Sequence, residues 1–398
     1  MNILILGNDG YIGYPLTVHL LERGHAVLGI DNHSRRIRVA DLGSSSLTPI
    51  NSPITRKVFL QKNYERFTNQ LEISLGIDNA IYLKNIVESF KPDAIIHLAE
   101  QPSAAWSMRD VNSAVTTQYE NVVSTLQLLW VMKAICPDAH LIKLGSMGEY
   151  GTPNCDIPEG RIPEFCNDYS TPEVGVLWKC PMNGLLFPRT AGSFYHLSKV
   201  HDTHNIEFAC RNWHLHSTDI MQGVVYGLLP KMDQVMTRFD YDECFGTVIN
   251  RFCVQAVAGH PLTVYGDGTQ TRGFIHLVDS INCITIALDN PPKIGEYRTL
   301  NQFSETYSIN QLAEIVCKEA KWFGLDPIIN PIPNPRLENE DHYYKPIHQG
   351  LYDLGFKPEV TIYDGIRSII EQILPFKHRI IEKVIIPEID WRRLYDTN

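Results

Sequence analysis

The sequence predicts an α/β fold, with a Rossmann-type, doubly wound parallel sheet and a smaller C-terminal α/β domain that binds substrate. Three observations support this prediction. Strand and helix patterns alternate through residues 1–145, glycines follow the first strand, and a tyrosine and a lysine stand four residues apart in a later helical segment. Alternating strands and helices are typical of a parallel sheet covered on both faces. A chain of 398 residues is long enough for two domains.

The elements of the first domain follow from their hydrophobic patterns. Short apolar runs predict strands, and apolar residues that recur every three to four positions predict helices. A polar stretch separates the second expected strand from the third. The expected strands are Ile3–Leu6, Ala26–Ile30, Glu72–Leu75, Ala94–Leu98 and Leu141–Leu144, and the expected helices are Pro15–Arg23, Ala80–Phe90 and Asn121–Ile135.

Residues 151–190 interrupt this alternation with six prolines and no clear period, so we expect a lid-like insertion there. We place a first domain at 1–222, including this insertion, and a second domain at 223–398. Part of the second segment is expected to cross back to the first domain. Its expected elements are helices at Asn250–Ala258 and Ile309–Ala320 and strands at Leu262–Tyr265 and Tyr297–Asn301.

Composition limits the classes of partner. With 35 Lys and Arg against 45 Asp and Glu, the net charge of −10 argues against nucleic acid or a membrane surface. No apolar run approaches the roughly 20 residues of a spanning helix, and the N-terminus lacks the basic region of a signal peptide. The nine cysteines are scattered without a CxxC pair, which predicts a reducing compartment and no metal site. We therefore expect a cytoplasmic protein.

The segment from Gly7 to Gly13, with glycines at 7, 10 and 13, lies between the first strand and the first helix. Glycines there permit a tight turn and let a pyrophosphate approach the helix N-terminus. Asp31 ends the second strand, where a carboxylate binds the adenosine ribose and selects NAD; its alternative role is a turn or helix cap. Arginines at 35, 36 and 38 would suit a 2′-phosphate, but Asp31 would repel it, so NAD is favoured.

Tyr195 and Lys199 are spaced to lie on one face of a helix. A lysine ammonium near a phenol favours the phenolate and lowers a pKa that is about 10 in model peptides. The pair therefore predicts a general base that takes a proton from a sugar or alcohol hydroxyl.

These features together resemble the extended, sugar-nucleotide-modifying branch of the short-chain dehydrogenase/reductase superfamily. Asn121–Thr125 is similar to the motif that steadies the catalytic helix in that group, and Ser146 stands where the third member of its catalytic triad lies. A strand-end cap is the alternative role for Ser146. The cofactor contacts expected with this resemblance are Gly7, Gly10, Tyr11, Ile12, Gly13, Asp31, Asn32, Ser34, Arg35, Ile77, Leu98, Asn121, Tyr195, Lys199 and Val225.

A second set of residues is expected to bind substrate. Residues 262–275 look like the segment that lines the nucleotide in nucleotide-sugar epimerases and dehydratases. Within it, Arg272 can clamp a diphosphate, unless it is an ordinary hairpin-surface arginine, and Arg336 is a second candidate. The expected substrate contacts are Gln101, Ser146, Gln222, Asn250, Val264, Tyr265, Arg272 and Arg336.

Longer strings resemble the UDP-sulfoquinovose synthase family: residues 144–154, 193–205, 222–227, 245–255, 259–273 and 333–344. The resemblance implies a homodimer that uses bound NAD to convert UDP-glucose and sulfite, free or delivered by a partner protein, into UDP-sulfoquinovose. It implies that Tyr195 takes the O4 proton during C4 oxidation. Elimination at C6, addition of sulfite to C6 and reduction at C4 then follow.

Three positions depart from related patterns. Met147-Gly148 replaces the Asp-Glu pair of 4,6-dehydratases, so the expected acid/base groups are Glu149 and His196, although Glu149 is equally suited to a supporting carboxylate. Pro102 stands where plant-type members carry an arginine near the sulfonate, and Gly76-Ile77-Asp78 replaces the usual Gly-Asp-Ile turn. Two alternative functions remain. The chain is either another UDP-sugar epimerase or 4,6-dehydratase, or a non-catalytic dinucleotide-binding protein.

Overall fold

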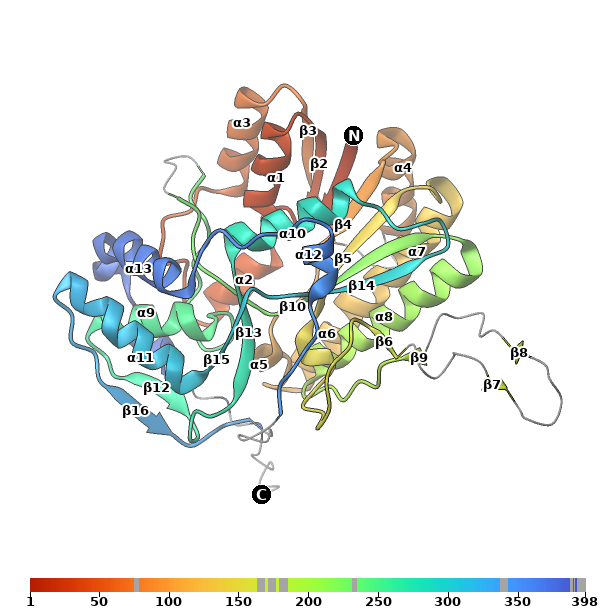
Figure 1. The fold of residues 1–398 in the computed structure, drawn as a ribbon. Helices are drawn as coiled ribbons and strands as arrows, with labels where there is room; N and C mark the ends of the chain where they lie inside the picture. Colours follow the sequence, from red (N-terminus) through yellow and green to blue (C-terminus); the bar gives the residue numbers. More distant parts are fainter. Residues whose placement is uncertain are drawn as a thin grey trace, which may run out of the picture.

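A computed structural model describes residues 1–74, 79–162, 169–170, 177–178, 185–230, 235–336, 343–386, 389 and 391. At its centre is a seven-stranded sheet in the order β14-β10-β5-β4-β1-β2-β3, with every neighbouring pair parallel (Figure 1). This confirms the predicted Rossmann-type fold. The strands are β1 (Asn2–Leu6), β2 (Ala26–Asp31), β3 (Phe67–Glu72), β4 (Ala94–His97), β5 (His140–Ser146), β10 (His216–Gln222) and β14 (Tyr297–Gln302).

Helices cover both faces of the sheet, as a parallel sheet requires. One face packs against α1 (Gly13–Glu22), α3 (Pro53–Asn63) and α10 (Leu277–Asp289), and the other against α4 (Ala80–Phe90), α7 (Ser124–Ile135) and α8 (Phe194–Trp213). The strand order reverses between β1 and β4. Ligands of doubly wound sheets bind at the carboxyl ends of the strands beside such a reversal, so the fold positions a site there.

The C-terminal segment builds a second hydrophobic core around α9 (Val248–Ala258), α11 (Ile309–Ala320) and α13 (Ile362–Ile373). Small sheets flank it, but α10 and β14 return to the first domain, and β14 pairs with β10. The boundaries at 1–222 and 223–398 therefore stay a prediction. The small sheets join β11 (Val224–Tyr226), β13 (Thr271–His276) and β15 (Glu305–Ser308), and β12 (Leu262–Tyr265) with β16 (Ile329–Ile332).

The insertion at 151–190 contains two short antiparallel strand pairs among its described residues. They join β6 (Arg161–Ile162) to β9 (Leu185–Leu186) and β7 (Tyr169–Ser170) to β8 (Leu177–Trp178). The Thr190 hydroxyl donates to the carbonyl of Tyr150 at 3.0 Å, which ties the end of the insertion to the segment after β5.

Three sequence-based expectations differ from the structure. The third strand covers Phe67–Glu72 rather than Glu72–Leu75, because it is an edge strand whose polar residues hide it; Leu75 itself lies outside the described residues. The polar stretch before it holds α2 (Ser34–Asp41) and α3. The expected helix from Asn121 begins as a π-helical turn over Tyr119–Val123, preceded by α5 (Ala104–Ser107) and α6 (Val111–Gln118).

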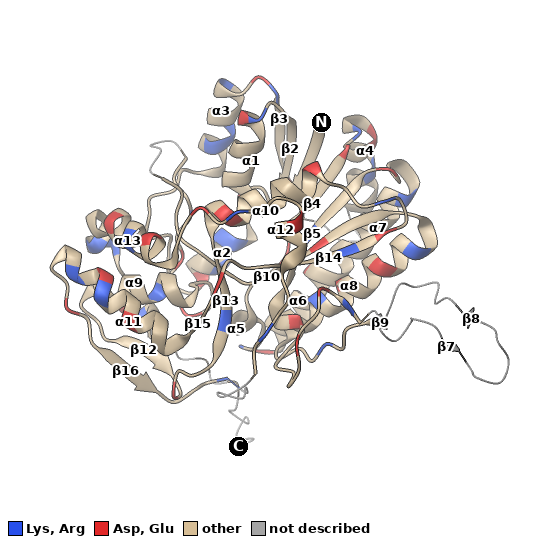
Figure 2. Cartoon of the chain, viewed as in Figure 1, with Lys and Arg blue, Asp and Glu red and all other residues tan. Residues whose placement is uncertain are grey.

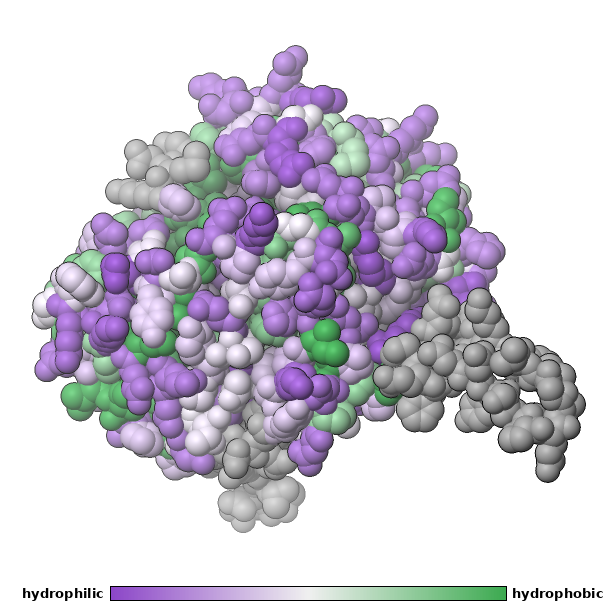
Figure 3. Space-filling view, viewed as in Figure 1, coloured by the Kyte–Doolittle hydropathy of each residue, from purple (hydrophilic) through white to green (hydrophobic). Residues whose placement is uncertain are grey.

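Acidic and basic residues are interspersed over the surface helices (Figure 2). The visible face is mainly hydrophilic, and hydrophobic side chains gather over β16 at its lower left, where Ile328 and Ile329 are exposed (Figure 3). Among the described residues, none of the helices combines the length and hydropathy that crossing a membrane requires.

Candidate active site

A first cavity of about 330 Å³ opens at the carboxyl ends of β1, β2, β4 and β5. Its floor is the glycine-rich turn between β1 and α1. Gly7 has φ +86° and lies against the backbone of Leu98, and a Cβ on Gly13 would stand 2.0 Å from the Gly7 carbonyl oxygen. Only glycine fits these positions, so the turn leaves room for a pyrophosphate at the start of α1.

Asp31 stands at the end of β2 and lines the same cavity. Its carboxylate accepts from the backbone N–H of Asp9 at 2.8 Å and of His33 at 2.7 Å. Burial and the neighbouring Asp9 carboxylate raise the pKa of Asp31, whereas these backbone bonds oppose the shift. A carboxylate held at this place suits the ribose hydroxyls of NAD.

Each arginine that the sequence offered for a 2′-phosphate is paired with a carboxylate. Arg35 lies 2.8 Å from Asp240, Arg36 binds Asp9 and Arg38 binds Glu120. Because these cations are already neutralised, the structure favours NAD over its phosphorylated form.

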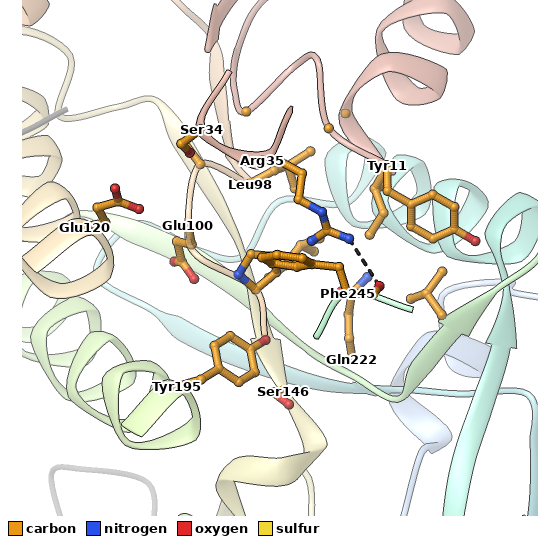
Figure 4. Close-up of a pocket in the computed structure, with 18 of the residues that line it drawn as sticks. Tyr11, Ser34, Arg35, Leu98, Glu100, Glu120, Ser146, Tyr195, Gln222 and Phe245 are labelled. Atoms are coloured by element: carbon orange, nitrogen blue, oxygen red, sulfur yellow. Dashed lines mark hydrogen bonds between the residues drawn. The ribbon is translucent and has the colours of Figure 1, made fainter. Parts of the chain in front are cut away.

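Most of the expected cofactor residues line the first cavity. Tyr11, Ser34 and Arg35 lie at one end and Tyr195 and Ser146 at the other (Figure 4). Asn121 is fully buried beside the cavity, and Ile77 lies outside the described residues. The lining includes Gly7, Gly10, Tyr11, Ile12, Gly13, Asp31, Asn32, Ser34, Arg35, Leu98, Tyr195, Lys199 and Val225.

The expected triad comes together where two strands meet α8. Ser146 ends β5, directly opposite Gln222 of β10. Tyr195 and Lys199 lie one turn apart on α8, with the Lys199 ammonium 5.7 Å from the centre of the Tyr195 ring. Lys199 also donates to the Leu144 carbonyl at 2.7 Å and forms an ion pair with Glu100. All three triad members line the first cavity.

The electrostatics of Tyr195 differ from the expectation. Burial raises the pKa of the phenol above its ordinary value, the Glu149 and Asp202 charges add to this, and a hydrogen bond with Ser146 opposes it. The four-residue spacing correctly predicted that Lys199 lies beside the Tyr195 ring. The expected lowering is absent because burial of the phenol is the largest effect on its pKa.

A second cavity of about 490 Å³ adjoins the first. Ser146, Tyr195, Gln222 and Pro102 line both, so the two cavities meet at the triad. The second cavity is also lined by His196, Arg272, Arg336, Tyr344 and Trp391.

His196 presents a neutral imidazole to the second cavity. Its Nδ1 lies 3.0 Å from the Ser193 hydroxyl. Burial, with the charges of Arg336 and Arg272, lowers the pKa of His196 to about 3. The ring is therefore uncharged near neutral pH, and a pKa this low makes it a weak base until bound ligand changes the charges around it.

The remaining expected substrate contacts are not among the described residues that line either cavity. Gln101 is fully buried and donates to Thr117 at 2.9 Å, and Asn250 accepts from the backbone of Gly227 at 3.2 Å. Val264 lies in the C-terminal core, and the Tyr265 hydroxyl accepts from Arg251 at 3.1 Å. Their role in binding the sugar nucleotide stays a prediction.

Glu149 lies behind Ser146, with no exposed surface, and is not among the described lining residues. Its carboxylate forms an ion pair with Arg189, lies 3.8 Å from the Lys143 ammonium and accepts from the Thr203 hydroxyl at 3.1 Å. It also accepts from the backbone N–H of Ser146 at 3.1 Å. Burial raises the pKa of Glu149 and the two cations oppose the shift. The geometry suits a support for Ser146.

Several lining residues were not expected as site residues, among them Glu100, Phe245 and Trp391. Glu100, in the loop after β4, and Phe245, whose ring lies 4.0 Å from the Arg35 guanidinium, line the first cavity. Trp391 lines the second and has its ring 5.3 Å from the Arg336 guanidinium. Phe245 and Trp391 reach the cavities through irregular segments, which carry no periodic signal. A charged residue in the short loop that follows β4 was the one detectable hint for Glu100.

Fold and site together define an NAD-dependent enzyme of the extended short-chain dehydrogenase/reductase class. The model of the NAD dependent epimerase/dehydratase family matches residues 3–171 and 191–301. UDP-glucuronic acid 4-epimerase from Bacillus cereus, solved with UDP-glucuronic acid and NAD, superposes with a TM-score of 0.66 over 94% of this chain and 99% of its own, at 21% identity.

Two relatives cover nearly the whole chain. UDP-sulfoquinovose synthase of Sulfolobus acidocaldarius is 43% identical over 99% of this chain and 98% of its own length. The chloroplastic UDP-sulfoquinovose synthase of Spinacia oleracea is 41% identical over 98% of this chain and 79% of its own. The chain therefore belongs to the UDP-sulfoquinovose synthase family, within the NAD dependent epimerase/dehydratase family.

Proposed function

We propose that the chain converts UDP-glucose and sulfite into UDP-sulfoquinovose. The observation that carries the proposal is the junction of the two cavities at Ser146 and Tyr195. A dinucleotide in the first cavity and a sugar nucleotide in the second would meet there. When bound, NAD accepts a hydride from the sugar and returns it at the end of the cycle.

In this proposal the triad handles the sugar O4. Ser146 hydrogen-bonds O4, and Tyr195 takes its proton as C4 is oxidised. Lys199 supplies a positive charge beside the phenol and holds the nicotinamide ribose. Because the phenol is held protonated by burial, we expect activation to depend on the charges that gather around it when both ligands bind.

The C4 ketone makes the C5 proton acidic, and we assign its removal to the His196 imidazole, which lines the second cavity. The C6 hydroxyl then leaves as water, after taking up a proton, and produces an enone. The sulfur of sulfite forms a bond to C6, C5 regains a proton and C4 is reduced. The net change is replacement of the C6 hydroxyl by a sulfonate, which balances UDP-glucose plus bisulfite against product plus water.

Arg272 and Arg336 are the cations of the second cavity that we assign to the diphosphate. Pro102 lines both cavities and offers no charge to sulfite.

Mass spectrometry of the NAD-loaded protein with UDP-glucose, with and without sulfite, tests the function. We expect a sulfite-dependent product in which the C6 hydroxyl is replaced by a sulfonate, and a Tyr195→Phe variant about 10²–10⁴-fold slower. A ketone, dehydrated sugar or UDP-galactose formed regardless of sulfite would instead assign an epimerase or dehydratase.

We also propose a homodimer formed through the helices beside the site. The described chain leaves large apolar side chains exposed on α6, the π-helical turn, α7 and α8, which pack against one another. An apolar face of this extent is typical of an interface between copies. Its exposed members are Val111, Val115, Tyr119, Leu126, Trp130, Phe194, Leu197 and Phe208.

Sedimentation of the Val115→Asp variant tests the dimer, with Ile54→Asp on α3 as the control. Both side chains are exposed apolar residues, at 62% and 76%, but only Val115 belongs to the proposed face. We expect Val115→Asp to sediment as a monomer and Ile54→Asp as a dimer. A monomeric unmodified protein would refute the proposal.

A further inference from the structure

Glu100 is a buried carboxylate at the centre of the site, with no role in the mechanism given above. It follows β4 and lines the first cavity between Glu120 and Tyr195 (Figure 4). Its side chain is only 3% exposed and forms an ion pair with Lys199, whose side chain is 6% exposed. Burying a carboxylate without such a partner is costly. Each of the two charges therefore offsets the cost of burying the other.

The backbone that carries Glu100 is fixed from both sides. The Glu100 N–H donates to the Leu98 carbonyl at 3.0 Å. On the other side, Asn121 accepts from the N–H of Gln101 at 2.7 Å and donates to the Gln101 carbonyl at 3.1 Å. Asn121 also donates to Ser198 of α8 at 2.8 Å. The loop that presents Glu100 is thus attached, through Asn121, to the helix that presents Lys199.

The other charges around Lys199 come from four elements. Lys143 of β5 donates to the Lys199 carbonyl at 3.3 Å, and His97 of β4 lies 3.9 Å from the Glu100 carboxylate. Asp202 of α8 and Asp219 of β10 are the nearby acids. Burial lowers the pKa of Lys199 to about 8, and the latter two carboxylates oppose that shift.

We propose that Glu100 is a positioning residue for the general-base step, which holds Lys199 in its charged form between the end of β4 and the Tyr195 phenol. The proposal rests on the function proposed above and adds a residue to it. Lys199 must stay protonated to favour the phenolate and to bind ribose hydroxyls. Burial works against that charge, and Glu100 is the carboxylate in direct contact with it.

The test is the titration of Lys199, followed by ¹³C NMR in lysine-labelled, NAD-loaded protein and assigned with Lys199→Met. We expect Glu100→Gln to lower the midpoint by about one pH unit or more, because an opposite charge has been removed. The charge-retaining Glu100→Asp should stay close to the unmodified protein. Glu207→Gln is the matched control, since Glu207 is a buried carboxylate of α8 that pairs with arginines instead.

The alkaline limb of the pH–rate profile with UDP-glucose and sulfite should move in the same direction in Glu100→Gln only. An unchanged Lys199 midpoint in that variant, or an equal shift in Glu207→Gln, would overturn the proposal. The NMR titration requires no substrate, so its result is separate from a failure of the proposed function.

A second variant keeps the proposal testable if Glu100→Gln does not fold. Lys199→Met leaves Glu100 buried and unpaired, so its carboxyl group should take up a proton near neutral pH. Difference infrared spectra should then show a buried carboxylic acid that the unmodified protein lacks and that disappears in Glu100→Gln/Lys199→Met. Absence of that band would also overturn the proposal.

Discussion

Replacing Glu149 by glutamine separates a supporting carboxylate from an acid/base catalyst. The side chain has no exposed surface and lies among Arg189, Lys143 and Thr203. Burial works against the Arg189 cation, but Glu149 and the other neighbouring acidic groups together outweigh it and raise the pKa of Arg189. The amide of glutamine would take away the anion that the two buried cations share; Asp219 lies 3.8 Å from Lys143, and Asp202 also interacts with Lys143.

The expected loss of unfolding free energy is about 3–5 kcal/mol, the cost of breaking a buried ion pair by removing one partner. That is a large part of the roughly 5–15 kcal/mol of a folded domain. We expect the isosteric double variant Glu149→Gln/Arg189→Met to recover part of the loss, since it removes the uncompensated cation as well. Turnover of the folded fraction should fall much less than in Tyr195→Phe.

Urea unfolding followed by tryptophan fluorescence measures these changes. Asp289→Asn is the control, because Asp289 and Arg23 form an ion pair 40% exposed on each side and such pairs contribute about 0–1 kcal/mol. An acid/base role predicts the opposite pattern: unchanged stability with a loss of kcat of about 10²–10⁴-fold. That result would refute our assignment of Glu149 as a support for Ser146.

Two further predictions follow from the same structure. Burial lowers the pKa of His140 to about 3, below the unfolded value of about 6.5. The unfolded chain therefore binds more protons than the folded protein between these two pH values. In urea unfolding, His140→Gln should reduce the slope with which the unfolding free energy falls on acidification by about 1.4 kcal/mol per pH unit. An unchanged slope would contradict this. Trp391→Ala should raise KM for UDP-glucose about two- to five-fold with little change in kcat, by removing a cation–π contact with Arg336. Trp322→Ala, at an exposed tryptophan far from either cavity, should leave KM unchanged.

The features that local pattern determines were predictable. The first strand, the glycine turn and Asp31 depend on neighbours in sequence, and the structure places them as expected. The helical spacing of Tyr195 and Lys199 likewise brought both side chains to one cavity. Edge strand β3 and helix α2 were missed because their residues are largely polar, so hydrophobic periodicity carries little information about them.

Contacts between distant segments were not predictable. Asn121 was expected to steady the catalytic helix and to contact the cofactor, but its hydrogen bonds to both backbone groups of Gln101, which join the loop after β4 to α8, were not anticipated. Trp391 enters the substrate cavity from the far end of the chain. No local pattern states which side chain a loop will present to a cavity, because that depends on segments up to several hundred residues apart.

The pKa of Tyr195 was also not predictable from local sequence, because it depends on burial and on distant residues. An ammonium four residues along a helix lowers the pKa of a phenol only when desolvation is small and the ammonium has no stronger partner. Here burial is the largest effect, and Glu100, almost one hundred positions earlier, takes the ammonium as its partner. Helical spacing therefore determines the relative position of Tyr195 and Lys199, whereas the protonation state of Tyr195 depends on the tertiary fold.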